Sequence, residues 1–151
     1  MGATDETDEQ DQFQNWLAHM DDALAEFSGR LPAALKESLD YTPASLDRLE
    51  AFLLERYPSV QAIKAEREPY LDGASRYVGE VFRRNIGGRW RIRTDDPKYV
   101  YAGLPELTFL KERDTPACPI KLVPTALARR TGTFLSTVFE NQAQRIAKAR
   151  G

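Results

Sequence analysis

Residues 71–94 constrain the fold of this chain more than any other stretch. They predict one helix, a double-glycine stop and one strand. In the helix, apolar residues recur with the period of about 3.6 residues that places them along one face. Gly87 and Gly88 end the helix, and the next six residues alternate arginine with other side chains, as strand residues on opposite faces do. The sequence therefore predicts a fold organised around one helix and the strand that follows it.

The residues before this stretch predict further helices. Apolar side chains recur on one helical face from Phe13 to Phe27 and again from Leu46 to Tyr57. Gly29 favours ending the first of these helices in a left-handed cap. We therefore expect a helical N-terminal half that packs on the central helix.

The residues after this stretch predict a small sheet and two helices. Residues 98–101, 107–110 and 120–123 alternate as strands do, so a hairpin and further strands are expected. Residues 124–130 predict a short helix, and Thr133 begins a last one. The fold class expected is α+β: a helical N-terminal half, a central helix, a small antiparallel β-meander and a closing C-terminal helix.

The domain organisation follows from length and composition. We expect residues 1–8 to be a disordered acidic tail and residues 9–151 to form a single α+β domain. The chain is 42% hydrophobic and 29% charged, as globular proteins are. No apolar run approaches the roughly 20 residues that cross a bilayer, so no membrane is expected as a partner. With one cysteine and no signal peptide, the expected location is cytoplasmic.

Charge is distributed unevenly, although the net charge is only −2. Residues 1–28 contain eight acids and no lysine or arginine, whereas residues 76–93 contain six arginines and one acid. Such asymmetry is typical of proteins with a nucleic-acid or acidic partner. The alternative, which we favour for most of these charges, is that the basic residues pair with the acids of residues 5–26.

Arginines of the central stretch form the main candidate binding surface. They lie at a helix end and on one predicted strand face. The candidates for partner binding are Arg76, Arg83, Arg84, Arg89, Arg91 and Arg93.

Glu80 lies among these arginines on the same predicted helix. Gly73 and Gly79 each cost the helix about 1 kcal/mol relative to alanine, so close packing of another segment is the expected reason for them. Glu80 would then be a partly buried carboxylate held by arginines. It is the residue on which an enzymatic or anion-binding function would depend.

Arg129 and Arg130 complete the candidate site, because they precede a predicted helix N-terminus, where anions can bind. A plain turn between helices is the favoured alternative. No phosphate-binding glycine loop occurs, and a composition with one histidine, His19, and one cysteine, Cys118, argues against a zinc site. We expect no metal, no cofactor and no catalytic residue.

Residues 70–140 resemble a bacterial protein family of unknown function. Its members share a glycine–glutamate pair on a helix, a glycine and a tryptophan at the start of a strand, and a turn aspartate. A strand begun by proline and a basic residue before a short helix follow. The matching residues are Gly79, Glu80, Gly88, Trp90, Asp95, Asp96, Pro119, Arg129 and Arg130. The arginines at 89, 91 and 93 depart from the pattern, and the resemblance implies an α+β domain without assigned chemistry.

Three functions are therefore expected, in order of preference. The first is a non-enzymatic binding or adaptor module that recognises an acidic protein partner through the arginine-rich face. The second is a small enzyme or anion-binding protein that uses Glu80. The third is single-stranded nucleic-acid binding, which the sequence pI of about 5.5 disfavours. The oligomeric state stays open.

Overall fold

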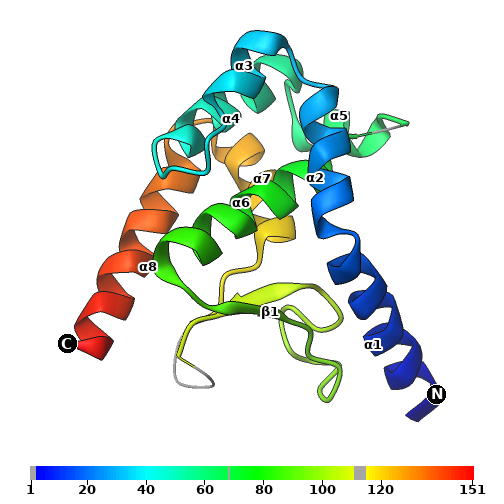
Figure 1. Ribbon diagram of the computed structural model, residues 1–151. Coiled ribbons are helices and arrows are strands. Elements are labelled where there is room, and N and C mark those ends of the chain that lie inside the picture. The colour runs from blue at the N-terminus through cyan, green and yellow to red at the C-terminus, as the bar shows by residue number, and fades with distance from the viewer. Residues whose placement is uncertain (1–2, 68, 111–114) are drawn as a thin grey trace.

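The computed structural model describes residues 3–67, 69–110 and 115–151 (Figure 1). It confirms the α+β class, with a helical N-terminal half and a closing C-terminal helix. The helices of the first half are α1 (Ala3–Ala18), α2 (Met20–Gly29), α3 (Ala33–Ser38), α4 (Ser45–Arg56) and α5 (Val60–Ala65). The second half contains α6 (Leu71–Ile86), β1 (Arg89–Arg91), β2 (Glu106–Thr108), α7 (Pro119–Arg129) and α8 (Phe134–Arg150).

Helix α6 is the centre of the fold. Figure 1 shows it in the middle of the molecule, with α8 on one side, α1 and α2 on the other, and the sheet beneath. Every residue from Ala74 to Phe82 is buried, including the charged side chains of Arg76 and Glu80. The part of the polar face that carries Arg76 and Glu80 is therefore covered, whereas Arg83 and Arg84 at the end of α6 remain partly exposed.

Two glycines on α6 allow this close packing. A Cβ atom at Gly73 would lie 2.4 Å from the ring of Phe27 in α2, and one at Gly79 would lie 2.1 Å from the indole of Trp90. Real Cβ atoms do not approach other atoms so closely, so alanine at either position requires a neighbour to move. The expected packing reason for both glycines is thereby confirmed.

Charged side chains from distant parts of the chain satisfy the ends of several helices. Glu50 of α4 is fully buried and accepts hydrogen bonds from the backbone N–H groups of Phe134 and Leu135, at the start of α8. Arg130 donates to the carbonyl oxygens of Leu54 and Tyr57, where α4 ends. These contacts supply partners for backbone groups that a helix end leaves unpaired.

The sheet is shorter than the sequence predicts. Strands β1 and β2 pair antiparallel, with Trp90 opposite Leu107, and a single bridge joins Leu107 to Ala117. The prediction of a strand at residues 98–101 is wrong, because hydrogen bonds between residues three apart fold that segment into successive turns. The strand that returns to pair with β1 is β2.

The strand predicted at residues 120–123 is also wrong. These residues lie in α7, which begins at Pro119, so the proline that the sequence assigns to a strand starts a helix instead. Proline is favoured at the first helical position, because its missing N–H would have no partner there. A four-residue alternation of apolar side chains does not distinguish a strand from one side of a helix.

The ends of the N-terminal helices also differ from those that the sequence predicts. The single helix expected through Phe27 is divided at His19 into α1 and α2. Gly29 is the last residue of α2, and Arg30, which follows it, has right-handed backbone angles, so the left-handed cap predicted at Gly29 is wrong. Helix α1 begins at Ala3 and thus includes residues 3–8 of the expected acidic tail. No helix in the described residues has the length and apolar character that crossing a bilayer requires.

Candidate functional site

The site is built on a contact between α6 and β1. Trp90 lies across Gly79, where the glycine leaves room for the indole ring. Its Nε1–H donates to Glu80 Oε2 at 2.9 Å, and its ring meets that of Trp16 edge to face at 4.9 Å between centroids. The indole is therefore fixed on three sides, and its single donor is already used.

Glu80 binds two arginines as well as the indole. Arg83 donates from Nε to Oε2 and from Nη2 to Oε1, both at 2.8 Å, and Arg84 Nε lies 3.7 Å from Oε1. The Glu80 side chain is 5% exposed, whereas those of Arg83 and Arg84 are 42% and 43% exposed. A buried carboxylate thus holds two guanidinium groups that still face solvent.

The ionisation of Glu80 follows from this environment. Burial raises the pKa of the carboxyl group, but the hydrogen bonds from Arg83 and Trp90 and the charges of Arg83 and Arg84 outweigh it, so the pKa lies below its usual range. Both carboxylate oxygens already accept strong hydrogen bonds. Glu80 is therefore ionised at neutral pH and poorly suited to accept a proton from a substrate.

Arg84 is also supported by Tyr41, a residue that the sequence does not point to. The guanidinium lies 3.7 Å above the centre of the Tyr41 ring. Tyr41 has a left-handed backbone with φ 63°, which costs a non-glycine residue about 1 kcal/mol or more. Its N–H donates to the Tyr77 hydroxyl at 2.9 Å and its carbonyl accepts from Asn85 at 2.8 Å, and these bonds hold the conformation.

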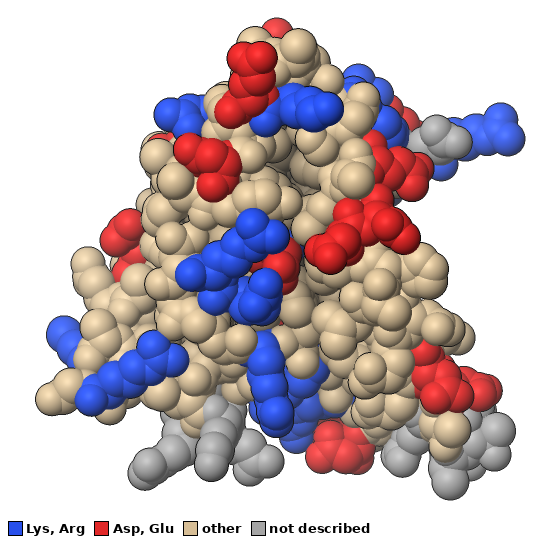
Figure 2. Space-filling model, in the orientation of Figure 1, with Lys and Arg blue, Asp and Glu red and all other residues tan. Residues whose placement is uncertain are grey.

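Arg89 extends the basic surface from α6 onto β1. Gly87 and Gly88 both have positive φ and make the turn between the two elements. The Arg89 side chain is exposed, and among the described residues it has no hydrogen-bond or ion-pair partner. Figure 2 shows the basic side chains gathered over the C-terminal half of α6 and over β1, with acidic side chains over α2 beside them.

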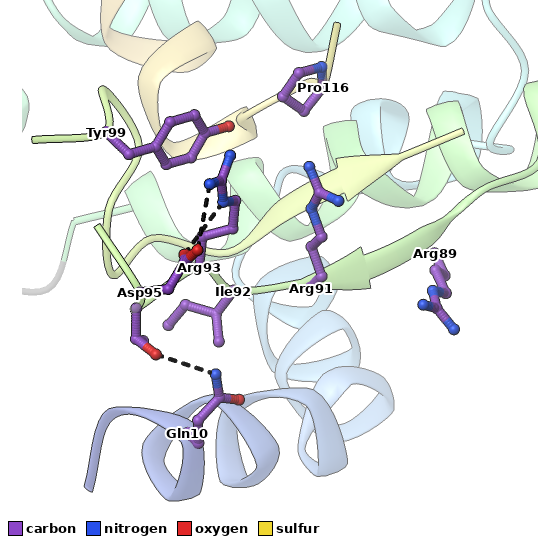
Figure 3. A pocket seen from close by; sticks show the side chains of 9 residues that line it. Gln10, Arg89, Arg91, Ile92, Arg93, Asp95, Tyr99 and Pro116 are labelled. Carbon is purple, nitrogen blue, oxygen red and sulfur yellow. Dashed lines mark hydrogen bonds and ion pairs between the residues drawn. The ribbon is translucent and has the colours of Figure 1, made fainter. Parts of the chain in front are cut away.

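Arg91 and Arg93, together with Arg89, line an open groove of about 870 Å³ beside β1 (Figure 3). Arg91 donates to the fully buried Glu106 at 3.0 Å, and Arg93 lies 3.4 Å from Asp95. Figure 3 shows Arg91 and Arg93 directed toward Tyr99 and Pro116, whereas Arg89 points away from them. Because β1 ends at Arg91, Arg93 lies beyond the strand, so the single strand face that the sequence predicts for the three arginines is not formed, although all three line the groove.

Tyr99 is the aromatic wall of this groove. Its ring lies under the guanidinium of Arg93, 4.3 Å from the centroid, and its hydroxyl donates to Glu106 at 3.1 Å. Burial, followed by the hydrogen bond to Glu106, raises the pKa of Tyr99 to about 12. The phenol is protonated at all physiological pH values and serves to hold the two neighbouring charged groups.

The remaining predicted site residues belong to the scaffold. Arg76 is buried, donates to Asp72 and to the carbonyl oxygen of Trp16, and lies over the Trp16 ring, so it joins α1 to α6. Arg129 lies over the ring of Phe134, and Arg130 caps α4. The structure therefore does not bring Arg76, Arg129 or Arg130 together with the exposed arginines.

Local carboxylates, rather than the acidic N-terminal segment, pair with the arginines of this region, except for Arg89. Their partners are Asp72, Glu80, Glu106 and Asp95. Within the described side chains, no ion pair joins these arginines to the acids of residues 8–26, so the predicted pairing is wrong for those acids; the acids at 5 and 6 lie outside the described side chains. The charge asymmetry of the sequence is thus retained on the surface of the folded molecule.

The described residues give little support to metal binding or to a reactive thiol. No group of three or more His, Cys, Asp or Glu side chains in this part of the chain could hold a metal ion. Cys118 is buried, and this burial raises the pKa of its thiol to about 11, so the reactive thiolate is scarce at neutral pH. No family model, curated protein or solved structure matches the chain. The resemblance of residues 70–140 to a bacterial family stays a prediction.

Proposed function

We propose that this protein is a non-enzymatic binding module that recognises an acidic partner protein through its exposed arginines. We call Arg83, Arg84, Arg89, Arg91 and Arg93 the arginine band. One observation carries the proposal: Glu80 and the Tyr41 ring hold Arg83 and Arg84 in place, although nearly half of each arginine side chain is exposed. Fixed and accessible guanidinium groups are suited to binding carboxylates.

The physical advantage of this arrangement is a smaller entropy loss on binding. A free arginine side chain loses up to about 2 kcal/mol of conformational entropy when it is immobilised. Arg83 and Arg84 have lost much of that freedom already, before any partner arrives. Guanidinium groups also match carboxylates in geometry, because each can donate two parallel hydrogen bonds.

An acidic protein is a better candidate than single-stranded nucleic acid. Proteins that bind single strands stack the bases on exposed aromatic rings. Here guanidinium groups cover the rings of Tyr41 and Tyr99, and Trp90 is buried.

A binding function is also a better candidate than an enzyme that uses Glu80. Its low pKa and its occupied oxygens leave it without the properties of a general base. The contact of Gly79 and Glu80 with Trp90 gives a physical reason for a helix glycine–glutamate pair to occur with a strand tryptophan. It therefore supports the proposed relation to the bacterial family of unknown function, and a cytoplasmic location is part of the same proposal.

The proposal is tested by titrating the protein with poly-L-glutamate and, separately, with oligo(dT), at low and high salt. We expect poly-L-glutamate to bind more tightly than oligo(dT), with an affinity that falls as salt rises. Arg89→Gln should weaken binding, because it removes an accessible charge without breaking a contact in the folded state. Arg129→Gln removes the same charge outside the band and serves as the matched control.

Two outcomes would overturn this proposal. The first is failure of the wild-type protein to bind poly-L-glutamate at low salt. The second is tighter binding of oligo(dT), which would favour nucleic acid as the partner.

A further inference from the structure

A pocket of about 480 Å³ opens beside the arginine band, between the α1–α2 junction and the start of β1. Its apolar lining comes from Leu17, Met20 and Trp90. Its polar lining comes from Asp21, Glu80, Arg83, Gly88 and Arg89. The pocket thus joins an apolar floor to two members of the band.

We propose that this pocket receives one large apolar side chain of the acidic partner, while a neighbouring carboxylate of the same segment binds Arg89 and Arg83. The partner is therefore a protein segment in which a leucine-like or aromatic residue is flanked by Asp or Glu. This inference rests on the proposed function and specifies what the arginine band recognises. The apolar residues of the pocket would then allow the protein to distinguish such a segment from a polyanion without an apolar side chain.

The floor of the pocket is suited to an apolar side chain. Trp90 is 9% exposed and its N–H is occupied by Glu80, so covering the small exposed part of the indole leaves no donor without a partner. Trp16 supports the ring from the edge, which keeps the floor in place. Met20 is flexible and polarisable, and such side chains adapt to differently shaped apolar groups. An apolar anchor in a small pocket is the usual centre of a protein interface.

The charges on the rim of the pocket are distributed unevenly. Arg83 and Arg89 lie on it together with Asp21, an exposed acid in the first turn of α2. The charge of Asp21 is close enough to act on Arg83, since it contributes to the raised pKa of that arginine after the larger effect of Glu80. A partner carboxylate is attracted to Arg89 and repelled by Asp21, so the two charges orient the segment across the pocket.

The experiment uses two capped heptapeptides of equal charge, Asp-Glu-Asp-Leu-Asp-Glu-Asp and the same peptide with alanine in place of leucine. Binding is followed by calorimetry and by tryptophan fluorescence. The chain has two tryptophans, and both lie at or next to the pocket. We expect the leucine peptide to bind about 10-fold more tightly, as a partly buried leucine side chain predicts.

Three variants separate the roles of the pocket and of its rim. Leu17→Gln should remove the difference in affinity between the two peptides, because Leu17 is a half-buried part of the pocket floor and glutamine makes it polar. Asp21→Asn should tighten binding of both peptides, and Arg89→Gln should weaken it for both. Thermal melting of each variant checks that the fold is retained, and the comparison of the two peptides on the wild-type protein does not depend on any variant.

The outcomes distinguish this inference from the function on which it rests. Equal affinity for the two peptides would overturn the pocket proposal and leave the acidic partner in place. Binding of neither peptide, together with no binding of poly-L-glutamate, would overturn both. If the peptides bind more tightly to the Asp21→Asn variant and more weakly to the Arg89→Gln variant, the proposed orientation is supported. If the affinity changes in the same direction in both variants, the orientation is contradicted.

Discussion

Replacing Gly79 by alanine tests the contact on which the site is built. In the interior of an exposed helix, this change normally stabilises a protein by about 1 kcal/mol. At Gly79, however, the new Cβ atom would lie 2.1 and 2.2 Å from two indole carbons of Trp90 and 3.2 Å from Pro119. The methyl group can be accommodated only if the indole moves.

The expected magnitude follows from what that movement disrupts. Inserting a methyl group into a packed core costs about 1–3 kcal/mol. Moving the indole also breaks its hydrogen bond to Glu80, a charged acceptor, which contributes about 1.5–3 kcal/mol. The gain in helix propensity offsets about 1 kcal/mol of these losses, so we expect Gly79→Ala to lower the free energy of unfolding by about 1.5–5 kcal/mol.

Urea denaturation followed by circular dichroism measures this change. Gly29→Ala is the matched control, because Gly29 also lies in a helix but has no atom within 4 Å of the added methyl group. We expect it to be as stable as the wild type or slightly more stable. Tryptophan fluorescence should change in Gly79→Ala only. A Gly79→Ala variant as stable as the wild type, with unchanged fluorescence, would refute the packing of Trp90 on α6.

Three further predictions concern buried polar groups. Because the folded pKa of Glu80 is lowered, its contribution to stability is present above its unfolded pKa and is lost as pH falls through the folded value. Glu80→Gln should therefore flatten the rise of stability with pH in the acidic range, and an unchanged pH profile would count against the ion pairs. Glu50→Gln should lower the free energy of unfolding by about 1–3 kcal/mol, because two backbone N–H groups of α8 lose a buried carboxylate acceptor. Chemical denaturation measures this change, and an unchanged stability would contradict the capping of α8 by Glu50. Cys118 should react with a thiol reagent only after unfolding at neutral pH, and rapid labelling of the native protein would contradict its burial.

Local sequence signals were sufficient for the central helix and for the start of its strand, which ends at Arg91 rather than at residue 94. The apolar period of residues 71–86, the two helix glycines and the glycine pair that ends the helix each have one dominant physical explanation. The burial of Glu80 among arginines follows from the same signals. Glycines inside a helix indicate that another segment packs closely on that side, and Glu80 lies beside Gly79. The helix and its end depend on residues within a few helical turns of each other, which is the range where sequence patterns are most informative. The residues that cover the two glycines, Phe27 and Trp90, come from other elements and are not indicated by that pattern.

The parts that were predicted wrongly depend on distant partners. Whether residues 98–101 or 106–108 pair with β1 is decided by the Glu106–Arg91 ion pair and by the packing of Leu107, neither of which has a local signal. The left-handed Tyr41 that supports Arg84 requires bonds from Tyr77 and Asn85, 36 and 44 residues away. The sequence predicts which arginines are present, but their division into fixed, exposed and structural groups arises from tertiary contacts.

The most direct test of the account is to observe the arginine side chains themselves. In nitrogen-15 labelled protein, the Nε–H groups give separate NMR signals when they are held in place. We predict slowly exchanging signals for Arg83 and Arg84 before any ligand is added, and shifts of Arg83 and Arg89 on titration with the leucine heptapeptide, while Arg129 stays unchanged. If the peptide bound without moving any signal of the arginine band, or did not bind at all, acidic-partner recognition by this surface would be contradicted.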